Sequence, residues 1–243
     1  MWNTNKTWVD YLLINLFLGK TIGILGVDNC GKSVLYNFIF TKKLKHGISS
    51  TDTREKTENV SIQIDNENYK IRLQRIFDVG GQRQLYPLKK LTFTTSDCII
   101  YIVRSDLIIN AEMLVNQCLT QKEQEELNDF RRKYKNGLAV DFENFKDWQE
   151  NIPFWEKVPF FEKGKPSRII VVGNHFGEIG REDTVPNFLD TNLKKDYGRN
   201  FRECFNRITG FFDESTEMKW VVGSLVSEKL ANQLVLDILK SIN

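Results

Sequence analysis

The chain has 243 residues, of which 41% are hydrophobic and 27% charged, and its 34 Lys and Arg against 32 Asp and Glu give a formal net charge of +2. This composition excludes a collagen, a disulfide scaffold and a wholly disordered chain. The near-neutral balance gives no reason to expect a nucleic-acid partner. Because the four cysteines are widely spaced and no run of 18 apolar residues occurs, we expect a cytoplasmic protein without a membrane span.

The first 19 residues have the pattern of an amphipathic helix. Trp8, Leu12 and Leu16 recur at four-residue intervals, so a helix over residues 1–19 would carry them on one apolar stripe. The stripe either packs on the body of the protein, which we favour, or makes a reversible peripheral contact with a membrane through residues 2–18.

Residues 20–243 alternate between predicted strands and helices. Apolar or alternating runs predict strands over residues 21–25, 60–64, 70–77, 98–103, 168–172 and 219–223. Helical spacing predicts helices over residues 34–42, 84–94, parts of 111–150, 190–212 and 228–242. Residues 43–58 are polar without periodicity, and we expect a loop there. The alternation indicates a three-layer α/β fold with a mostly parallel six-stranded sheet flanked by helices.

The segment at about 111–166 is an insertion between the fourth and fifth predicted strands. It is longer than a crossover requires. Its first half is charged and favours a helix, and its second half is aromatic, with Phe142, Phe145, Trp148, Phe154, Trp155, Phe160 and Phe161. We expect these aromatic side chains to pack on the body of the domain; the alternative is a surface for a partner.

A glycine-rich loop follows the first predicted strand and precedes the first predicted helix of this domain. It matches the pattern G-x-x-x-x-G-K-S, in which backbone N–H groups surround phosphate oxygens, the Lys contacts the β- and γ-phosphates and the Ser hydroxyl binds Mg²⁺. An ordinary glycine turn is the alternative. The residues expected to bind phosphate are Gly26, Val27, Asp28, Asn29, Cys30, Gly31, Lys32, Ser33 and Val34.

A second motif, D-V-G-G-Q-R, follows the strand predicted at 70–77. Asp78 at its start can hold Mg²⁺ through water, Gly81 lets the backbone approach a terminal phosphate, and Gln82 can orient an attacking water. A strand-to-helix turn with a capping residue is the alternative, but the preceding phosphate loop favours the functional interpretation.

The strings G-V-D-N-C-G-K-S and D-V-G-G-Q-R together resemble the Arf and heterotrimeric G-protein α-subunit branch of Ras-like GTPases. The resemblance covers residues 20–110 and 167–243. It implies a P-loop GTPase fold, GTP or GDP as ligand and Mg²⁺ as cofactor. It also implies two loops, about 47–58 and 79–90, that sense the γ-phosphate and contact protein effectors and regulators.

In that branch a Thr in the first of these loops binds Mg²⁺. Thr51, Thr53 and Thr57 are candidates in this chain, and Thr57 is the best placed. Arg54-Glu-Lys-Thr57 resembles the R-x-K-T of α-subunits, in which the Arg stabilises the transition state in cis. Arg54 is therefore a candidate catalytic residue, with a solvated surface side chain as the alternative.

The guanine-binding motif of the family is only partly present. Asn174 fits, but Gly177 stands where the family has the Asp that accepts hydrogen bonds from guanine, so we expect reduced discrimination between guanine and other bases. Glu178 could substitute if the loop shifts, His175 or Phe176 could stack on the base, and Ser224 is the weak counterpart of the last family motif.

These features predict a GTP-binding switch that hydrolyses GTP to GDP and phosphate. The alternative is a degenerate, GTPase-like nucleotide-binding or scaffold protein, without turnover or with relaxed base selectivity. A P-loop kinase of small metabolites shares only the first motif.

Overall fold

The computed structural model describes residues 20–45, 53–64, 67–79, 85–109, 121–151, 166–175, 185–210 and 216–242. Along 53–64 and 67–79, and at residues 20 and 123, it describes the backbone alone. The predicted helix at 1–19 and the aromatic residues Phe154, Trp155, Phe160 and Phe161 lie outside the described residues.

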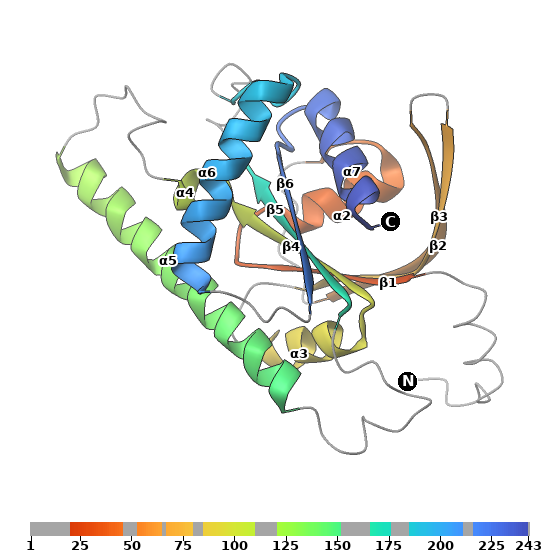
Figure 1. Ribbon diagram of the computed structural model, residues 1–243, viewed down its shortest axis with the longest axis horizontal. Helices are drawn as coiled ribbons and strands as arrows, with labels where there is room; N and C mark the ends of the chain where they lie inside the picture. The colour runs from red at the N-terminus through yellow and green to blue at the C-terminus, as the bar shows by residue number, and fades with distance from the viewer. Residues whose placement is uncertain are drawn as a thin grey trace.

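A central sheet has the strand order β2-β3-β1-β4-β5-β6 (Figure 1). Only the β2–β3 pair is antiparallel; the other four pairs are parallel. The prediction of an α/β fold with a mostly parallel sheet flanked by helices is therefore confirmed. The strands are β1 (Lys20–Gly26), β2 (Thr53–Ile64), β3 (Glu67–Val79), β4 (Cys98–Arg104), β5 (Arg168–Asn174) and β6 (Glu217–Gly223).

Helices cover both faces of the sheet because the central strands are apolar on both sides. Ile100 and Ile102 of β4 join the core beneath α2 (Lys32–Thr41) and α7 (Glu228–Ile242). The alternate residues Ile99 and Tyr101 join the opposite core. That second core is covered by α3 (Tyr86–Thr95), α4 (Ser105–Ile108), α5 (Gln121–Glu150) and α6 (Thr191–Thr209).

The long helix α5 lies between β4 and β5 in the chain and packs its aromatic side chains on the domain, as predicted for three of them. Phe142, Phe145 and Trp148 are buried. Phe142 lies edge-on to Tyr101 of β4 at a centroid distance of 5.0 Å, and Phe145 stacks on Phe93 of α3 at 4.6 Å. Aromatic pairs of this geometry add to the stabilisation from burial.

The loop predicted over residues 43–58 is wrong in its last part, because β2 begins at Thr53. Residues 53–58 pair antiparallel with the end of β3, as in the partners Thr53↔Val79 and Lys56↔Ile76. Their polar side chains gave no alternating pattern, but an edge strand needs only backbone pairing and tolerates polar residues on both faces.

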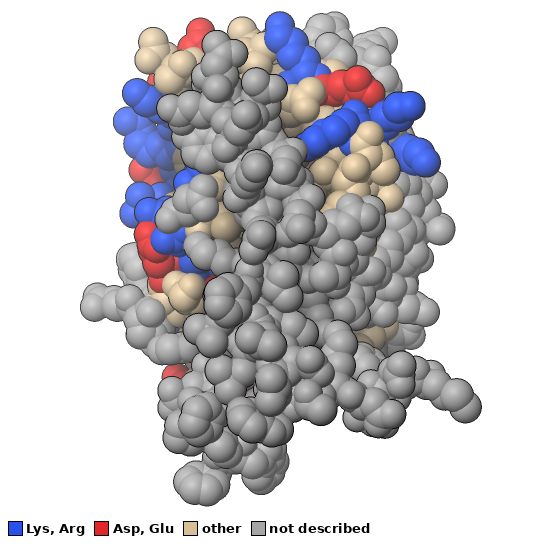
Figure 2. All heavy atoms as spheres, turned by 90° about the vertical axis from the view of Figure 1, so that its right-hand side faces the viewer, with Lys and Arg blue, Asp and Glu red and all other residues tan. Residues whose placement is uncertain are grey.

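On one face of the molecule the described charges are mixed. On the face shown in Figure 2, Lys and Arg lie among Asp and Glu along its upper and left-hand margins, in keeping with the net charge of +2. Among the described residues, no helix is both long and apolar enough to cross a bilayer.

Candidate functional site

The loop between β1 and α2 has a backbone that its glycines make possible. Gly26 has φ 150°, and a Cβ atom there would lie 2.1 Å from the Ile102 carbonyl oxygen of β4. Gly31 has φ 97° and forms the N-cap of α2. Since that cap has no side chain and the first turn has no acidic residue, the positive end of α2 faces the loop without an internal anion.

Lys32 is buried beneath this loop, with an exposed fraction of 6%. Its Nζ donates to the Val27 carbonyl oxygen at 2.7 Å and lies 3.7 Å from Cys30 Sγ. Asp28 and Asn29, at the tip of the loop, are exposed, and Ser33 and Val34 are half-buried. The ammonium group is therefore held inside the curve of the loop, where it can neutralise an anion that the backbone N–H groups bind.

Asn174, at the end of β5, connects this loop to a second one. Its buried amide donates from Nδ2 to the Cys30 carbonyl oxygen at 3.0 Å, and its Oδ1 accepts from the Leu225 N–H at 3.1 Å. Next to it, Ser224 Oγ donates to the His175 carbonyl oxygen at 2.7 Å. The structure thus brings Asn174 to the loop at 26–33, and it brings Ser224, 50 residues later in the chain, to the residue that follows Asn174.

The expected stacking of His175 on a base does not fit its position. The side chain is 4% exposed, and its Nδ1 lies 3.1 Å from the Tyr197 hydroxyl of α6. Burial lowers the pKa of the imidazole below its usual 6.5; Asp106 opposes this effect and Arg104 adds to it. The imidazole ring therefore faces α6 inside the domain and not the solvent.

A polar network behind His175 was not predicted from the sequence. The hydroxyl groups of Tyr197 and Ser105 lie 2.8 Å apart, and the Tyr134 hydroxyl of α5 accepts from the Arg104 N–H at 2.7 Å, one residue before Ser105. The available signal was the position of Ser105, directly after an apolar strand, at the carboxyl edge where parallel sheets bind ligands.

The backbone register places two further candidates at this edge of the sheet. Asp78 of β3 pairs with Ile24 of β1 on one side and with Arg54 of β2 on the other. Neighbouring strands lie about 4.8 Å apart, so the Arg54 backbone lies about 10 Å from that of Ile24 in β1. Ile24 precedes Gly26, the first residue of the glycine-rich loop, by two residues. Gly81 and Gln82 lie outside the described residues.

Thr57 is not placed where a Mg²⁺ ligand was expected. It lies at an irregularity of β2 between Lys56 and Glu58, three residues from Arg54 and so about 10 Å further from the phosphate-loop end of the sheet. The expectation assumed a free loop, and the pairing of residues 53–58 with β3 moves Thr57 away.

Comparison with known proteins adds to this geometry. A sequence model of the ADP-ribosylation factor (Arf) family matches residues 13–128, which include the phosphate loop and the D-V-G-G-Q-R motif. ADP-ribosylation factor J of Dictyostelium discoideum is 25% identical over 152 residues, covering 56% of this chain and 76% of that relative. Over residues 13–128 the chain is therefore similar to the Arf branch of the Ras-like P-loop GTPases.

The fold of this protein is also found in solved structures. A structure of the mammalian SRP receptor superposes with a TM-score of 0.51, over 92% of this chain and 100% of that one. The two sequences are 12% identical, so the likeness concerns the fold alone. Among the described side chains, no cluster of three or more His, Cys, Asp and Glu residues could hold a metal ion. The side chain of Asp78 is not among those described.

Proposed function

We propose that this protein is a molecular switch that binds GTP with Mg²⁺ and hydrolyses it to GDP and phosphate. The observation that carries the proposal is the buried Lys32 ammonium inside the β1–α2 loop, bonded to the loop's own Val27 carbonyl at 2.7 Å. A phosphate group would replace that carbonyl as the partner of the ammonium, at the positive end of α2. The match of residues 13–128 to the Arf family model supports guanine nucleotides as the ligand class.

Hard oxygen donors at the end of the sheet suit Mg²⁺. The Ser33 hydroxyl lies in the first turn of α2, and Asp78 lies near the end of β3 next to β1, so both residues belong to elements that meet at the phosphate loop. Hydroxyl and carboxylate oxygens are the ligands that Mg²⁺ prefers. When bound, the ion would supply positive charge to the β- and γ-phosphates.

Hydrolysis then requires a positioned water and stabilisation of the charge on the transferring group. In the proposal, Gln82 orients the water, Gly81 contacts the γ-phosphate and Arg54 supplies a cation in cis, an arrangement worth about 10³-fold or more where it operates. The register of Arg54 with Asp78 supports this assignment, since it brings the Arg54 backbone to the phosphate-loop end of the sheet.

The change of state would involve residues about 47–58 and 79–90. For Thr57 to bind Mg²⁺, residues 53–58 must leave their pairing with β3, because that pairing holds Thr57 away from the loop. The conformation with β2 and β3 paired over these residues is therefore the one expected without a γ-phosphate, and binding GTP would expose a different surface to effectors and regulators.

The second candidate function is a scaffold that binds nucleotide without turnover or without base selectivity. Gly177 in place of a carboxylate favours it, and so does His175, whose buried ring offers no stacking surface. Loss of a bidentate charged contact reduces discrimination by roughly 30- to 1000-fold.

The test is to denature the purified protein, identify any released nucleotide by chromatography, and measure GTP and ATP hydrolysis with Mg²⁺. We expect released GDP or GTP, slow GTP hydrolysis, and turnover at least about tenfold lower in Gln82→Leu. Gln124→Leu, the same substitution at an exposed position of α5, is the matched control. Equal hydrolysis by the Gln82→Leu variant would remove the proposed role of Gln82. An empty protein that binds neither nucleotide would favour the scaffold.

A further inference from the structure

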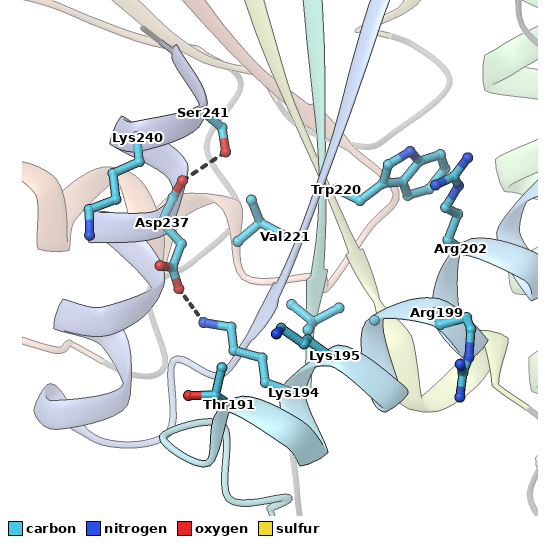
Figure 3. Close-up of a pocket in the computed structure, with 12 residues that line it drawn as sticks. Thr191, Lys194, Lys195, Arg199, Arg202, Trp220, Val221, Asp237, Lys240 and Ser241 are labelled. Carbon is cyan, nitrogen blue, oxygen red and sulfur yellow. Dashed lines mark hydrogen bonds and ion pairs between the residues drawn. The ribbon is translucent and has the colours of Figure 1, made fainter.

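A groove lies along the outer edge of β6, between α6 and α7. It has a volume of about 520 Å³, and none of its lining residues belongs to the loop at 26–33 (Figure 3). We refer to it as the β6 groove. Its lining residues are Thr191, Lys194, Lys195, Gly198, Arg199, Arg202, Trp220, Val221, Val222, Asp237, Lys240 and Ser241.

The backbone of β6 presents hydrogen-bonding groups to this groove. The Glu217 N–H donates to Ser167 and the Gly223 carbonyl accepts from His175, both toward β5. Because backbone groups alternate sides along a strand, those of Met218, Trp220 and Val222 point away from β5. Among the described strands, none pairs with this edge.

The floor of the groove is apolar and fixed in position. Trp220 packs edge-on against Phe205 of α6 at a centroid distance of 5.2 Å and against Phe201 at 6.1 Å. Val221 faces the opposite core, beneath α7. A segment lying along β6 would therefore find backbone partners in the plane of the sheet and apolar side chains on both sides of it.

The walls are basic. Five of the twelve lining residues are Lys or Arg, and Asp237 is the single acidic one among them. Arg199 pairs with Asp196 at 2.9 Å, but both side chains are largely exposed, so that pair is weak. The structure gives Lys195, Arg202 and Lys240 no ion pair among the residues it describes.

One ion pair crosses the groove. Lys194 of α6 contacts Asp237 of α7, and Gln233 donates to the other carboxylate oxygen of Asp237 at 3.1 Å. The two charged side chains are about a quarter exposed. A carboxylate from outside could take the place of Asp237 as the partner of Lys194, so Asp237 is an internal competitor for an acidic ligand.

We propose that the β6 groove binds an extended, acidic segment of a partner protein. The segment pairs through its backbone with Met218, Trp220 and Val222 and places carboxylates between the basic side chains of α6 and α7. An exposed strand edge is a template for an added strand, and basic walls select acidic residues. The charge also protects the edge against unselective pairing.

The first test uses the full chain and a labelled synthetic peptide in which Glu and Val alternate, followed by fluorescence anisotropy at low ionic strength. We expect binding that added salt weakens. The same peptide methylated at alternate backbone nitrogens should bind at least about tenfold more weakly, because it loses hydrogen bonds worth about 1 kcal/mol each. A Lys–Val peptide should not bind.

Amide hydrogen exchange by NMR tests the register directly. With the Glu–Val peptide bound, the amides of Met218, Trp220 and Val222 should exchange more slowly, while those of Lys219 and Val221, which face β5, should not change. If the three outward amides are already protected in the free protein, the edge is covered and the proposal is overturned.

Variants test the walls. Arg199→Glu with Arg202→Glu should weaken peptide binding at least about tenfold, and Asp237→Asn, which releases Lys194, should strengthen it several-fold, roughly three- to tenfold. The matched control is Arg207→Glu with Lys229→Glu, positions outside the groove. Thermal unfolding shows that each variant is folded.

Three results would contradict the proposal. They are equal binding of the methylated peptide, no effect of the Arg199 and Arg202 reversals, and binding of anionic vesicles or an oligonucleotide in place of the peptide. Lys32→Ala should leave peptide binding unchanged, so failure at the groove and failure of the proposed nucleotide site can be told apart.

Discussion

At the carboxyl end of β5, Asn174 uses both ends of its amide to join loops that are far apart in the chain. The Nδ2 bond to Cys30 holds the phosphate loop, and the Oδ1 bond from Leu225 holds the loop before α7. Both partners are backbone groups in a buried position, so losing either bond leaves an unsatisfied polar atom at a cost of about 1–3 kcal/mol. Asn174 therefore has a structural role that does not depend on a bound nucleotide.

His175 should make the stability of the protein depend on pH. Burial lowers its pKa in the folded state below the usual 6.5, so the unfolded chain binds more protons as the pH falls through 6.5. The free energy of unfolding should therefore decrease on acidification from neutral pH to about pH 5.5. Urea unfolding at several pH values measures this, and the pH dependence should be smaller in His175→Asn.

The other histidine, His46, provides the matched control for that experiment. His46→Asn should keep the pH dependence of the parent. If His175→Asn also keeps it, the titration of His175 is not linked to folding, and its imidazole has the same pKa in the folded protein as in the unfolded chain.

Among the elements, α5 gives the domain its second core. Besides its buried aromatic side chains, it contributes Asp141, which accepts from Lys89 of α3 at 3.1 Å and from the Tyr101 hydroxyl of β4 at 2.8 Å. Trp148 Nε1 also donates to the Tyr86 hydroxyl, at the start of α3, at 2.8 Å. Helix α3 follows the D-V-G-G-Q-R segment, which belongs to the proposed switch. The contacts with α5 therefore hold α3 on the side of the helix that faces away from solvent.

Two phenylalanines of α5 provide a matched comparison. Phe142 is 0% exposed and Phe130 is 46% exposed on the same helix. Phe142→Ala should lower the free energy of unfolding by about 3–5 kcal/mol, because it removes a buried ring and leaves a cavity. Phe130→Ala should change it by about 0.5 kcal/mol or less. Denaturant unfolding measures both, and similar losses would contradict the packing of α5.

Sequence patterns predicted the buried elements better than the exposed ones. The runs at 98–103 and 168–172 are apolar because β4 and β5 are covered on both faces, and this requirement is visible in the residues themselves. The start of β2 was missed because its pairing with β3 depends on backbone groups, which every residue carries. The glycine-rich turn at 26–31, between β1 and α2, was predicted correctly because its glycines are required by local geometry, whereas the burial of His175 depends on α6, a distant segment.

At the scale of the whole molecule, the two candidate binding regions lie at different borders of one sheet. The candidate nucleotide site lies at the carboxyl ends of β1 and β3 to β5, where parallel sheets bind ligands, and the β6 groove runs along the outermost strand. Asn174 ends β5 and Ser224 follows β6, so these two residues lie between the glycine-rich loop and the β6 groove in the order of the strands.

Nucleotide binding at the loop 26–33 should be measurable as an increase in the free energy of unfolding of the whole domain. A ligand that binds only the folded state raises the free energy of unfolding by about 2.7 kcal/mol at one hundred times its dissociation constant. We expect GTP with Mg²⁺ to raise the unfolding midpoint, ATP to do so equally if Gly177 has removed base selectivity, and Lys32→Ala to lose most of either effect. Lys43→Ala, an exposed lysine just after α2, is the matched control. If the Lys32→Ala variant were stabilised as much as the parent, the buried ammonium would not bind phosphate, and nucleotide would have to bind elsewhere on the protein.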